Sequence, residues 1–293
     1  MEYLEDKYYT CKYDRPFKEI FLKEKNKDML KALLELVLNI KINEIEVKPN
    51  ERNTGNLKVR RKTYDALLET DKGKIEIEVN ATSEKYLYPR NTAYICDLYS
   101  HHTLVSEEYN EEVMIMQLNF TYGLGNKKEM MSNYKLRNNE GKEFVKNFQI
   151  IEINMDYYLN LWYHNVGKNN SLIEKNKLLI MLGLDKKELE KLSKDYKEVN
   201  KYMEELDKLN HSPEFREYMT YEEDQRKIFN TKVREETEKS LEKVKKEGLQ
   251  QGIVTGAKQK SIEIAKEMLQ DGYSIDEISK LTKLSLDDIN NIK

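Results

Sequence analysis

The sequence predicts an α/β fold, in which a β-sheet is flanked by helices, followed by a long helical region. Between residues 12 and 165, segments of helical apolar spacing and segments of strand-like alternation follow in the order helix, strands, helix, strand. After about Ser171 the composition changes to charged, helix-forming residues. We therefore expect a core at 12–165, a helical region at 171–270 that is a candidate coiled coil, and a small helical element at 271–293.

The first predicted element is a helix from Pro16 to about Asn39. Asp14 is a candidate N-cap, and Pro16 falls in the first turn, where its missing N–H costs nothing. Apolar residues then recur near helical spacing, at Phe17, Ile20, Phe21, Met29, Leu33, Leu36 and Val37. A short strand from Glu44 to Val47 and a loop, PNERNTGN at 49–56, come next.

Two further strands are predicted at Lys58–Thr70 and Lys74–Asn80, joined by the polar turn Asp71-Lys72-Gly73-Lys74. Gly73 can adopt the positive φ that tight turns require, so this segment is a candidate hairpin. A helix from about Pro89 to Leu104 follows it. Strands at Glu112–Phe120 and Phe148–Ile153 then complete the sheet.

The segment from Pro213 to Gln270 is predicted as one very long helix or two broken ones. Gly248, Gly252 and Gly256 are four residues apart, so they line one stripe of any helix there. Each glycine weakens a helix by about 1 kcal/mol relative to alanine. A frayed helix and the close approach of a partner helix both remain open.

Composition excludes several classes of protein. The chain of 293 residues has a formal net charge of -3, so any contact with nucleic acid must rest on local basic patches. No apolar segment approaches the length of a membrane span, and the N-terminus lacks the apolar stretch of a signal peptide. Cys11 and Cys96 show neither metal-ligand nor disulfide spacing. We expect a reduced, cytoplasmic protein without a zinc site.

The hairpin contains the residues that indicate chemistry. Side chains alternate between the faces of a strand, so Asp65 shares a face with Glu69, and Glu78 shares one with Asn80. A loop with an even number of residues places Asp65 and Glu78 on the same face. Two converging carboxylates repel each other unless a cation lies between them, and Mg²⁺ prefers such oxygen ligands. A solvated hairpin face is the alternative reading.

Beyond this pattern, the chain resembles the recombination-promoting nuclease (Rpn) family, transposase-like proteins of the PD-(D/E)XK nuclease superfamily. The similar segments cover about half of the chain and occur in order. They are DRPFKEIF at 14–21, YDALLET at 64–70, IEIEVN at 75–80, Arg90 with Tyr94 and Tyr99, EEVMIMQLNFTYG at 111–123, YKLRNNEGKEF at 134–144 and the C-terminal segment at 262–292.

This resemblance implies a restriction-endonuclease-like core with a mixed sheet, and a metal-dependent DNA endonuclease that promotes recombination. Asp65 and Glu78 would bind Mg²⁺ or Mn²⁺, with the carbonyl group of Val79 as a further ligand. Position 80 carries Lys in the wider superfamily and usually Gln in this family, whereas this chain has Asn80. Asn80 is therefore a catalytic candidate that lacks the usual positive charge. A weakened or inactive nuclease fold that binds DNA or mediates assembly is the alternative function.

Basic residues near the hairpin are candidate DNA contacts. Arg61 and Lys62 precede it, and their position favours phosphate contact over a solubilising strand edge. Arg90 matches the family pattern and either touches the DNA backbone or braces an active-site carboxylate. Lys18 and Asp14 match the family's first-helix motif, and for Asp14 a helix-cap role is the simpler interpretation.

Two other features have competing interpretations. Tyr86, Tyr88, Tyr94 and Tyr99 are suited to base stacking, but core packing is favoured. In the C-terminal segment, Ser274 with Glu277 and Ser285 with Asp288 form capping-box patterns, which predict two short helices. A DNA-reading helix-turn-helix would begin its second helix with acidic residues that repel phosphate. The sequence therefore favours an assembly or docking element, with the C-terminal helices as a route to a homo-oligomer.

Overall fold

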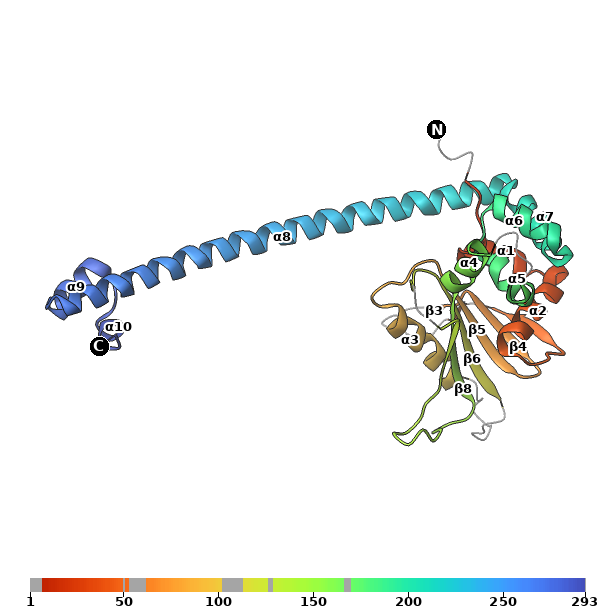
Figure 1. Ribbon diagram of the computed structural model, residues 1–293, viewed down its shortest axis with the longest axis horizontal. Coiled ribbons are helices and arrows are strands. Elements are labelled where there is room, and N and C mark those ends of the chain that lie inside the picture. Colours follow the sequence, from red (N-terminus) through yellow and green to blue (C-terminus); the bar gives the residue numbers. More distant parts are fainter. Residues whose placement is uncertain are drawn as a thin grey trace. The chain divides into compact units, whose positions relative to one another are not determined.

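A computed structural model gives the structure of the chain (Figure 1). It describes residues 7–49, 51–52, 62–101, 113–125, 129–165 and 170–292. The chain divides into two compact units, Met1–Glu217 and Tyr218–Lys293. The division falls after Glu217 rather than near residue 171, because the helices that follow residue 171 share a hydrophobic core with the sheet.

A mixed β-sheet is the centre of the first unit. In the described part of the chain it has six strands in the order β1-β4-β5-β6-β8-β7. β5, β6 and β8 are parallel, and the other pairs are antiparallel. The strands are β1 (Ile45–Lys48), β4 (Ala66–Thr70), β5 (Gly73–Asn80), β6 (Met114–Thr121), β7 (Met131–Tyr134) and β8 (Phe148–Asn154). A separate pair joins β2 (Glu51–Arg52) to β3 (Lys62–Thr63). The predicted fold class is confirmed.

Helices cover both faces of this sheet (Figure 1). On one face a large core joins sheet residues such as Leu68 and Ile77 to six of the described helices. These are α1 (Asp14–Phe21), α2 (Lys27–Leu38), α4 (Met155–Tyr163), α5 (Ser171–Gly183), α6 (Lys186–Asp195) and α7 (Lys197–Asn210). On the other face α3 (Leu87–Ser100) packs Ile95 and Leu98 against Leu67 in a smaller core. The helical layer at 171–210 thus belongs to the first unit.

The predicted helix from Pro16 to Asn39 is two helices, which corrects that expectation. α1 ends at Phe21, and a short 3-10 turn, η1 (Glu24–Asn26), precedes α2. The buried side chain of Asn26 donates from Nδ2 to the carbonyl oxygen of Ile20 at 2.8 Å. This bond satisfies a carbonyl group that the end of α1 leaves without a helical partner. Apolar periodicity continues across the break and conceals it.

The predicted hairpin is present, and a two-residue loop sets its register. Thr70 pairs with Gly73, so Asp71 and Lys72 form the loop. Gly73 has φ +131°, and a Cβ atom there would lie 2.1 Å from the carbonyl oxygen of Met114 on β6. Only glycine fits this position, because the backbone conformation and the neighbouring strand both exclude a side chain. The loop is even, as the shared face of Asp65 and Glu78 requires.

Strand β7 was not predicted from the sequence. Its residues MSNY lack apolar alternation, and most of their side chains are exposed, as is usual for a short strand at the edge of a sheet. The predicted strand Lys58–Thr70 is described only from residue 62, and there it divides into β3 and β4 with a bend at Asp65. The other predicted strands occur with shifts of one or two residues at their ends.

The second unit consists of helices. α8 (Pro213–Gln270) is one continuous helix that begins in the first unit, and α9 (Ile275–Thr282) and α10 (Leu286–Asn290) follow it. Ala265, Ile278 and Leu284 contribute to a small core there. Both predicted caps occur: the Oγ atoms of Ser274 and Ser285 accept hydrogen bonds from the N–H groups three residues ahead. None of the described helices has the length and apolarity to cross a membrane.

Candidate active site

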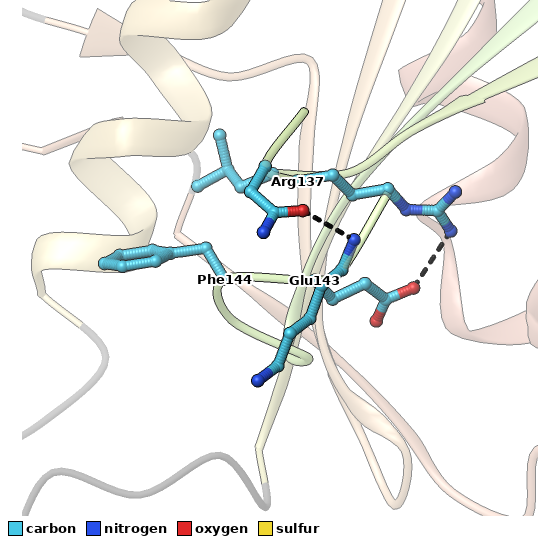
Figure 2. A pocket seen from close by; sticks show the side chains of 6 residues that line it. Arg137, Glu143 and Phe144 are labelled. Atoms are coloured by element: carbon cyan, nitrogen blue, oxygen red, sulfur yellow. Dashed lines mark hydrogen bonds and ion pairs between the residues drawn. The ribbon is translucent and has the colours of Figure 1, made fainter. Parts of the chain in front are cut away.

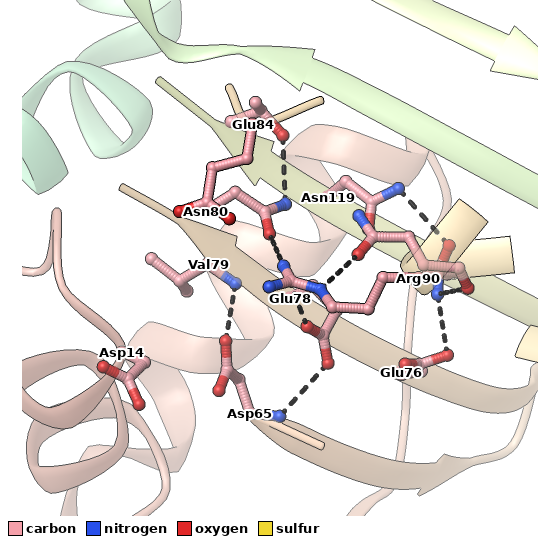
Figure 3. A network of polar contacts seen from close by, with 12 residues as sticks. Asp14, Asp65, Glu76, Glu78, Val79, Asn80, Glu84, Arg90 and Asn119 are labelled. Atoms are coloured by element: carbon pink, nitrogen blue, oxygen red, sulfur yellow. Dashed lines mark hydrogen bonds and ion pairs between the residues drawn. The ribbon is translucent and has the colours of Figure 1, made fainter. Parts of the chain in front are cut away.

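Asp65 and Glu78 come together on the face of the sheet that α3 covers. Ala66 pairs with Ile77, so Asp65, immediately before β4, lies opposite Glu78 on β5. The N–H of Val79 donates to Oδ2 of Asp65 at 2.8 Å, and the N–H of Asp65 donates to Oε1 of Glu78 at 3.4 Å. Figure 3 shows both carboxylates at this edge of the hairpin. Backbone hydrogen bonds thus fix the two acids as a pair.

The same strand geometry places the carbonyl group of Val79. In an extended strand the N–H and C=O of one residue point to the same neighbouring strand. Since the N–H of Val79 reaches Asp65, its carbonyl oxygen also faces the β4 side. The carbonyl oxygen of Asn80 faces the other way and accepts from the N–H of Tyr122 at 2.9 Å. Val79 is therefore the residue of β5 whose carbonyl oxygen can join the two acids.

A cation from a different helix lies beside each acid. Nζ of Lys18, on α1, is 2.9 Å from Oδ1 of Asp65 and 3.3 Å from Oδ2 of Asp14. Nη2 of Arg90, on α3, is 4.0 Å from Oε2 of Glu78. The Arg90 side chain is 44% exposed, whereas that of Glu78 is 5% exposed. Arg90 therefore braces a buried carboxylate and is still partly exposed to solvent.

The side chain of Asn80 is a bridge between two elements. Its Oδ1 accepts from Nη2 of Arg90 at 2.5 Å, and its Nδ2 donates to Oγ1 of Thr121 on β6 at 3.1 Å. Asn80 is buried. Its amide thus holds the guanidinium of Arg90 in place, and both ends of the amide are engaged within the protein.

Asp14 does not cap the helix, which corrects the sequence-based interpretation. α1 begins at Asp14 itself, Tyr13 occupies the N-cap position, and no side chain caps this end. The carboxylate of Asp14 instead forms an ion pair with Lys18, one turn further along the helix. Asp14 therefore belongs to the electrostatic surroundings of Asp65 rather than to the end of the helix.

A buried polar network lies on the same face of the sheet as Glu78, and sequence reasoning missed it. Gln117 donates from Nε2 to Oε2 of Glu76 at 3.0 Å and to the carbonyl oxygen of Asn91 at 2.7 Å. Asn91 donates to Asn119 at 3.1 Å, and Asn119 donates to Gln117 at 3.3 Å. The signal was present in β6, where MIMQLNFT places two amides within an otherwise apolar strand. Burying polar side chains costs free energy unless they find hydrogen-bond partners, so two amides in an apolar strand indicate a buried polar network.

Burial and mutual repulsion dominate the electrostatics of these acids. Burial, followed by the nearby charge of Asp65, raises the pKa of Glu78 to about 8. Burial and then the charge of Glu78 raise the pKa of Glu76 well above its ordinary value. For Asp65, burial raises the pKa more than the ammonium group of Lys18 lowers it. The site therefore favours any cation that stabilises the ionised carboxylates.

The donor set fits a divalent cation that prefers oxygen. In the described cluster, full ionisation gives four negative charges against two positive ones, an excess of two negative charges. The acids are Asp14, Asp65, Glu76 and Glu78, and the cations are Lys18 and Arg90. Among the described residues no group of three His, Cys, Asp or Glu side chains forms a metal cage. Mg²⁺ fits two carboxylates and a carbonyl because it usually keeps several waters and binds substrate phosphates.

The structure describes only some of the remaining predicted site residues. Arg61 lies outside the described residues, and for Lys62 only the backbone, in β3, is described. Tyr94 and Tyr99 pack against the smaller core, as favoured, whereas Tyr86 and Tyr88 are exposed at the start of α3. The expectation of core packing is thus wrong for the latter two, which precede the part of α3 that meets apolar strands.

The segment at 135–144, which also belongs to the resemblance, forms a surface loop after β7. Its residues line a hollow of about 530 Å³ in which Phe144 is 83% exposed (Figure 2). Oε1 of Glu143 accepts from Lys135 at 2.9 Å and from Arg137 at 3.0 Å. Lys135 and Arg137 are thus paired within this loop.

Comparison with known protein families identifies the C-terminal helices. Residues 258–293 match the model described as Rpn/YhgA-like nuclease family, C-terminal HTH domain. This match overturns the preference for an assembly or docking element. Of the acidic residues that argued against a DNA reader, Asp288 serves in helix capping, since its carboxylate accepts from Ser285 and its N–H donates to the Ser285 hydroxyl oxygen.

Searches of curated proteins and of solved structures find no match to the chain. Residues 11–238, which is most of the chain, match the model described as PD-(D/E)XK nuclease family transposase. The match includes the mixed sheet, the hairpin and both helices that supply the flanking cations. The chain therefore belongs to the PD-(D/E)XK nuclease family of transposases.

Proposed function

We propose that this protein is a metal-dependent DNA endonuclease that promotes recombination by cutting DNA with little sequence specificity. The observation that carries the proposal is the pair Asp65 and Glu78, whose side chains are 14% and 5% exposed, bonded through the hairpin backbone and flanked by Lys18 and Arg90. Membership of a nuclease family and an HTH domain support DNA as the substrate. The negative charge at the carboxylates opposes DNA unless a cation is bound there.

Asp65, Glu78 and the carbonyl oxygen of Val79 would hold Mg²⁺, with Mn²⁺ as a substitute. When bound, the ion polarises the phosphate and lowers the pKa of an attacking water. The protein's own contribution is to orient both carboxylates and to offset part of the cost of ionising Asp65. The ammonium group of Lys18 favours the charged form of Asp65, and two backbone N–H bonds fix the direction of both acids.

Arg90 would supply the positive charge that a lysine at position 80 supplies in the wider superfamily. Its guanidinium is next to Glu78 and is half exposed, so it can contact a phosphate at the acids with its planar array of donors. Asn80 holds this guanidinium through a 2.5 Å hydrogen bond. We therefore assign Asn80 a positioning role and Arg90 the role of stabilising charge on the phosphate.

The second unit would dock the nuclease on DNA through its C-terminal HTH domain. The long helix α8 exposes apolar side chains, among them Phe229, Leu241 and Val244. Apolar residues on a solvated helix suit contact with another helix, so α8 is also our candidate for a homo-oligomer interface. Neither role requires catalysis.

One observation favours a second function, a DNA-binding module without catalysis. Both ends of the Asn80 amide are engaged by Thr121 and Arg90, so position 80 itself offers nothing to water or phosphate. If Arg90 does not replace the missing cation, hydrolysis is too slow to matter, and the protein acts through binding or assembly. Metal binding does not separate the two functions, whereas cleavage does.

The test is nicking of supercoiled plasmid by the full-length protein with Mg²⁺ or Mn²⁺. Asp65→Asn and Glu78→Gln keep the shape of each acid and remove its charge, so each should abolish nicking. Glu69→Gln is the matched control, because Glu69 lies on β4 near the turn of the hairpin, away from Asp65 and Glu78, and is 47% exposed. No nicking by folded wild type, together with DNA binding, would establish the second function. Nicking then restored by Asn80→Lys would identify position 80 as the cause.

A further inference from the structure

A pocket of about 420 Å³ lies between α3 and the sheet, next to the carboxylates. Tyr88 and Asn91 line it from α3, and Gln117, Asn119, Tyr134 and Glu152 line it from β6, β7 and β8. The volume is within the range of small-ligand pockets, about 300 to 1,000 Å³. It can therefore accommodate a nucleobase with its sugar.

The strand register places this pocket directly beside the metal acids. Glu78 pairs with Asn119, and Asn119 pairs with Glu152, so these residues form one row across three neighbouring strands. Adjacent strands are about 4.8 Å apart, so the far end of the row is roughly 10 Å from Glu78. Figure 3 shows Asn119 and Glu76 next to the carboxylate pair. A DNA strand with a phosphate at Glu78 thus brings an adjacent nucleotide to the pocket.

The floor of the pocket differs from the rest of this sheet face. Under the second half of α3, Ile95 and Leu98 pack on Ile115 and Leu67, as an ordinary core does. Under the first half, the sheet instead presents the interlocked amides Gln117 and Asn119 with Glu152, all at most 4% exposed. A core could be completed more cheaply with apolar residues. The change to polar groups within one helix length indicates a binding floor.

The walls and floor have the chemistry of base recognition. Tyr88 and Tyr134 are 42% and 48% exposed at the rim, where aromatic rings can stack on a base. At the floor, the carboxylate of Glu152 can accept from the exocyclic amino group of a base. The interlocking bonds between Asn91, Asn119 and Gln117 engage these amides with one another, so they form a rigid support beneath the base before any ligand arrives.

We infer that this pocket binds one unstacked nucleobase of the DNA strand whose phosphate lies at Asp65 and Glu78. A base within a duplex cannot enter such a pocket, so the preferred substrate is single-stranded or locally unpaired DNA. Glu152 at the floor favours bases with an amino group, adenine, cytosine or guanine, over thymine. This inference rests on the proposed function, because it names the substrate class of the same site.

The test measures binding on full-length protein with Mg²⁺, read before any product accumulates, because a bound cation offsets the repulsion between the acids and the DNA phosphate. The probe is a short single-stranded oligothymidylate with one central 2-aminopurine, whose fluorescence falls when the base stacks on an aromatic ring. Wild type should lower the fluorescence. Tyr88→Ala and Tyr134→Ala should remove this fall and weaken binding about fivefold to about a hundredfold, the range for loss of one aromatic–base stack. Tyr134→Phe should retain both properties, because stacking needs the ring and not the hydroxyl group.

The matched control is Tyr163→Ala, which removes a tyrosine that is 50% exposed at the end of α4 and does not line the pocket. It should bind the probe as wild type does. A Glu152→Gln variant should reduce the preference for 2-aminopurine over thymine at the central position. Equal binding by wild type and both alanine variants would overturn the inference, as would a fall in fluorescence that the alanine variants keep.

Plasmid nicking by the same preparations separates the two proposals. If nicking depends on Asp65 but Tyr88→Ala and Tyr134→Ala do not affect the probe, the nuclease is supported and the base pocket is refuted. A fall in fluorescence that the tyrosine variants lose, without any nicking, would support the pocket and refute the nuclease.

Discussion

The bridge from Asn80 to Arg90 predicts a measurable energetic coupling. Asn80→Ala removes a hydrogen bond to a guanidinium and a neutral one to Thr121, from a side chain that is 4% exposed. Hydrogen bonds to charged groups contribute about 1.5–3 kcal/mol and neutral ones about 0.5–1.5 kcal/mol. Arg90 is 44% exposed, so water recovers part of its loss and the lower values apply. We expect Asn80→Ala to lower the free energy of unfolding by about 2 kcal/mol.

A double-mutant cycle isolates the part that belongs to the bridge. Urea unfolding, followed by circular dichroism, is measured for Asn80→Ala, Arg90→Met and the double variant. We expect a coupling energy of about 1 kcal/mol, since the second substitution finds the bond already lost. Thr121→Val provides the comparison, because it removes only the neutral partner of Asn80. The positioning role of Asn80 is refuted if the two single effects add to within about 0.3 kcal/mol.

Three further predictions concern the hairpin, the helical layer and the metal. Gly73→Ala should destabilise the fold by more than about 3 kcal/mol, because its Cβ would collide with a backbone carbonyl at φ +131°; a smaller loss in urea unfolding would disprove the steric argument. Glu205→Gln should cost about 0.5 to 1 kcal/mol at pH 7, because its hydrogen bond with Lys25 lowers the pKa of Glu205 to about 2. This cost should disappear as the pH falls from about 4.5 towards 2, and a cost that persists at pH 2 would contradict it. Because burial raises the pKa of Glu78 to about 8, the free energy of unfolding of the metal-free protein should decline as the pH rises from about 4.5 to about 8. Mg²⁺ binding should tighten over the upper part of that interval and release a proton. Calorimetric titrations in two buffers of different ionisation enthalpy measure that proton, and Glu78→Gln should remove it.

Local sequence determined much of the hairpin, and this part could be predicted. The alternation of IEIEVN and the glycine before it define two strands and a tight turn without reference to any other segment. The pairing of Asp65 with Glu78 then follows from the register alone. Helix boundaries were harder to predict from the sequence. The break before α2 depends on the buried amide of Asn26, and apolar periodicity gives no sign of it.

The partners of the two acids could not be predicted in the same way. Lys18 and Arg90 lie 47 residues before and 25 residues after Asp65 in the chain, and only the docking of α1 and α3 on the sheet brings them to it. The amides Gln117 and Asn119 are visible in the sequence as polar residues at alternate positions of an apolar strand. To recognise them as the floor of a pocket, one must also know which helix covers the strand.

The source of positive charge separates this site from the superfamily pattern. A lysine two positions after the second acid delivers its charge from the same strand, so the hairpin alone carries the site. In this chain each acid receives a cation from its own helix, Lys18 from α1 and Arg90 from α3. Asn80 is then the link that fixes the second cation to the sheet. Catalysis in this chain should therefore depend on how firmly the two helices dock, and substitutions that loosen α3 should reduce nicking even where the carboxylates remain intact.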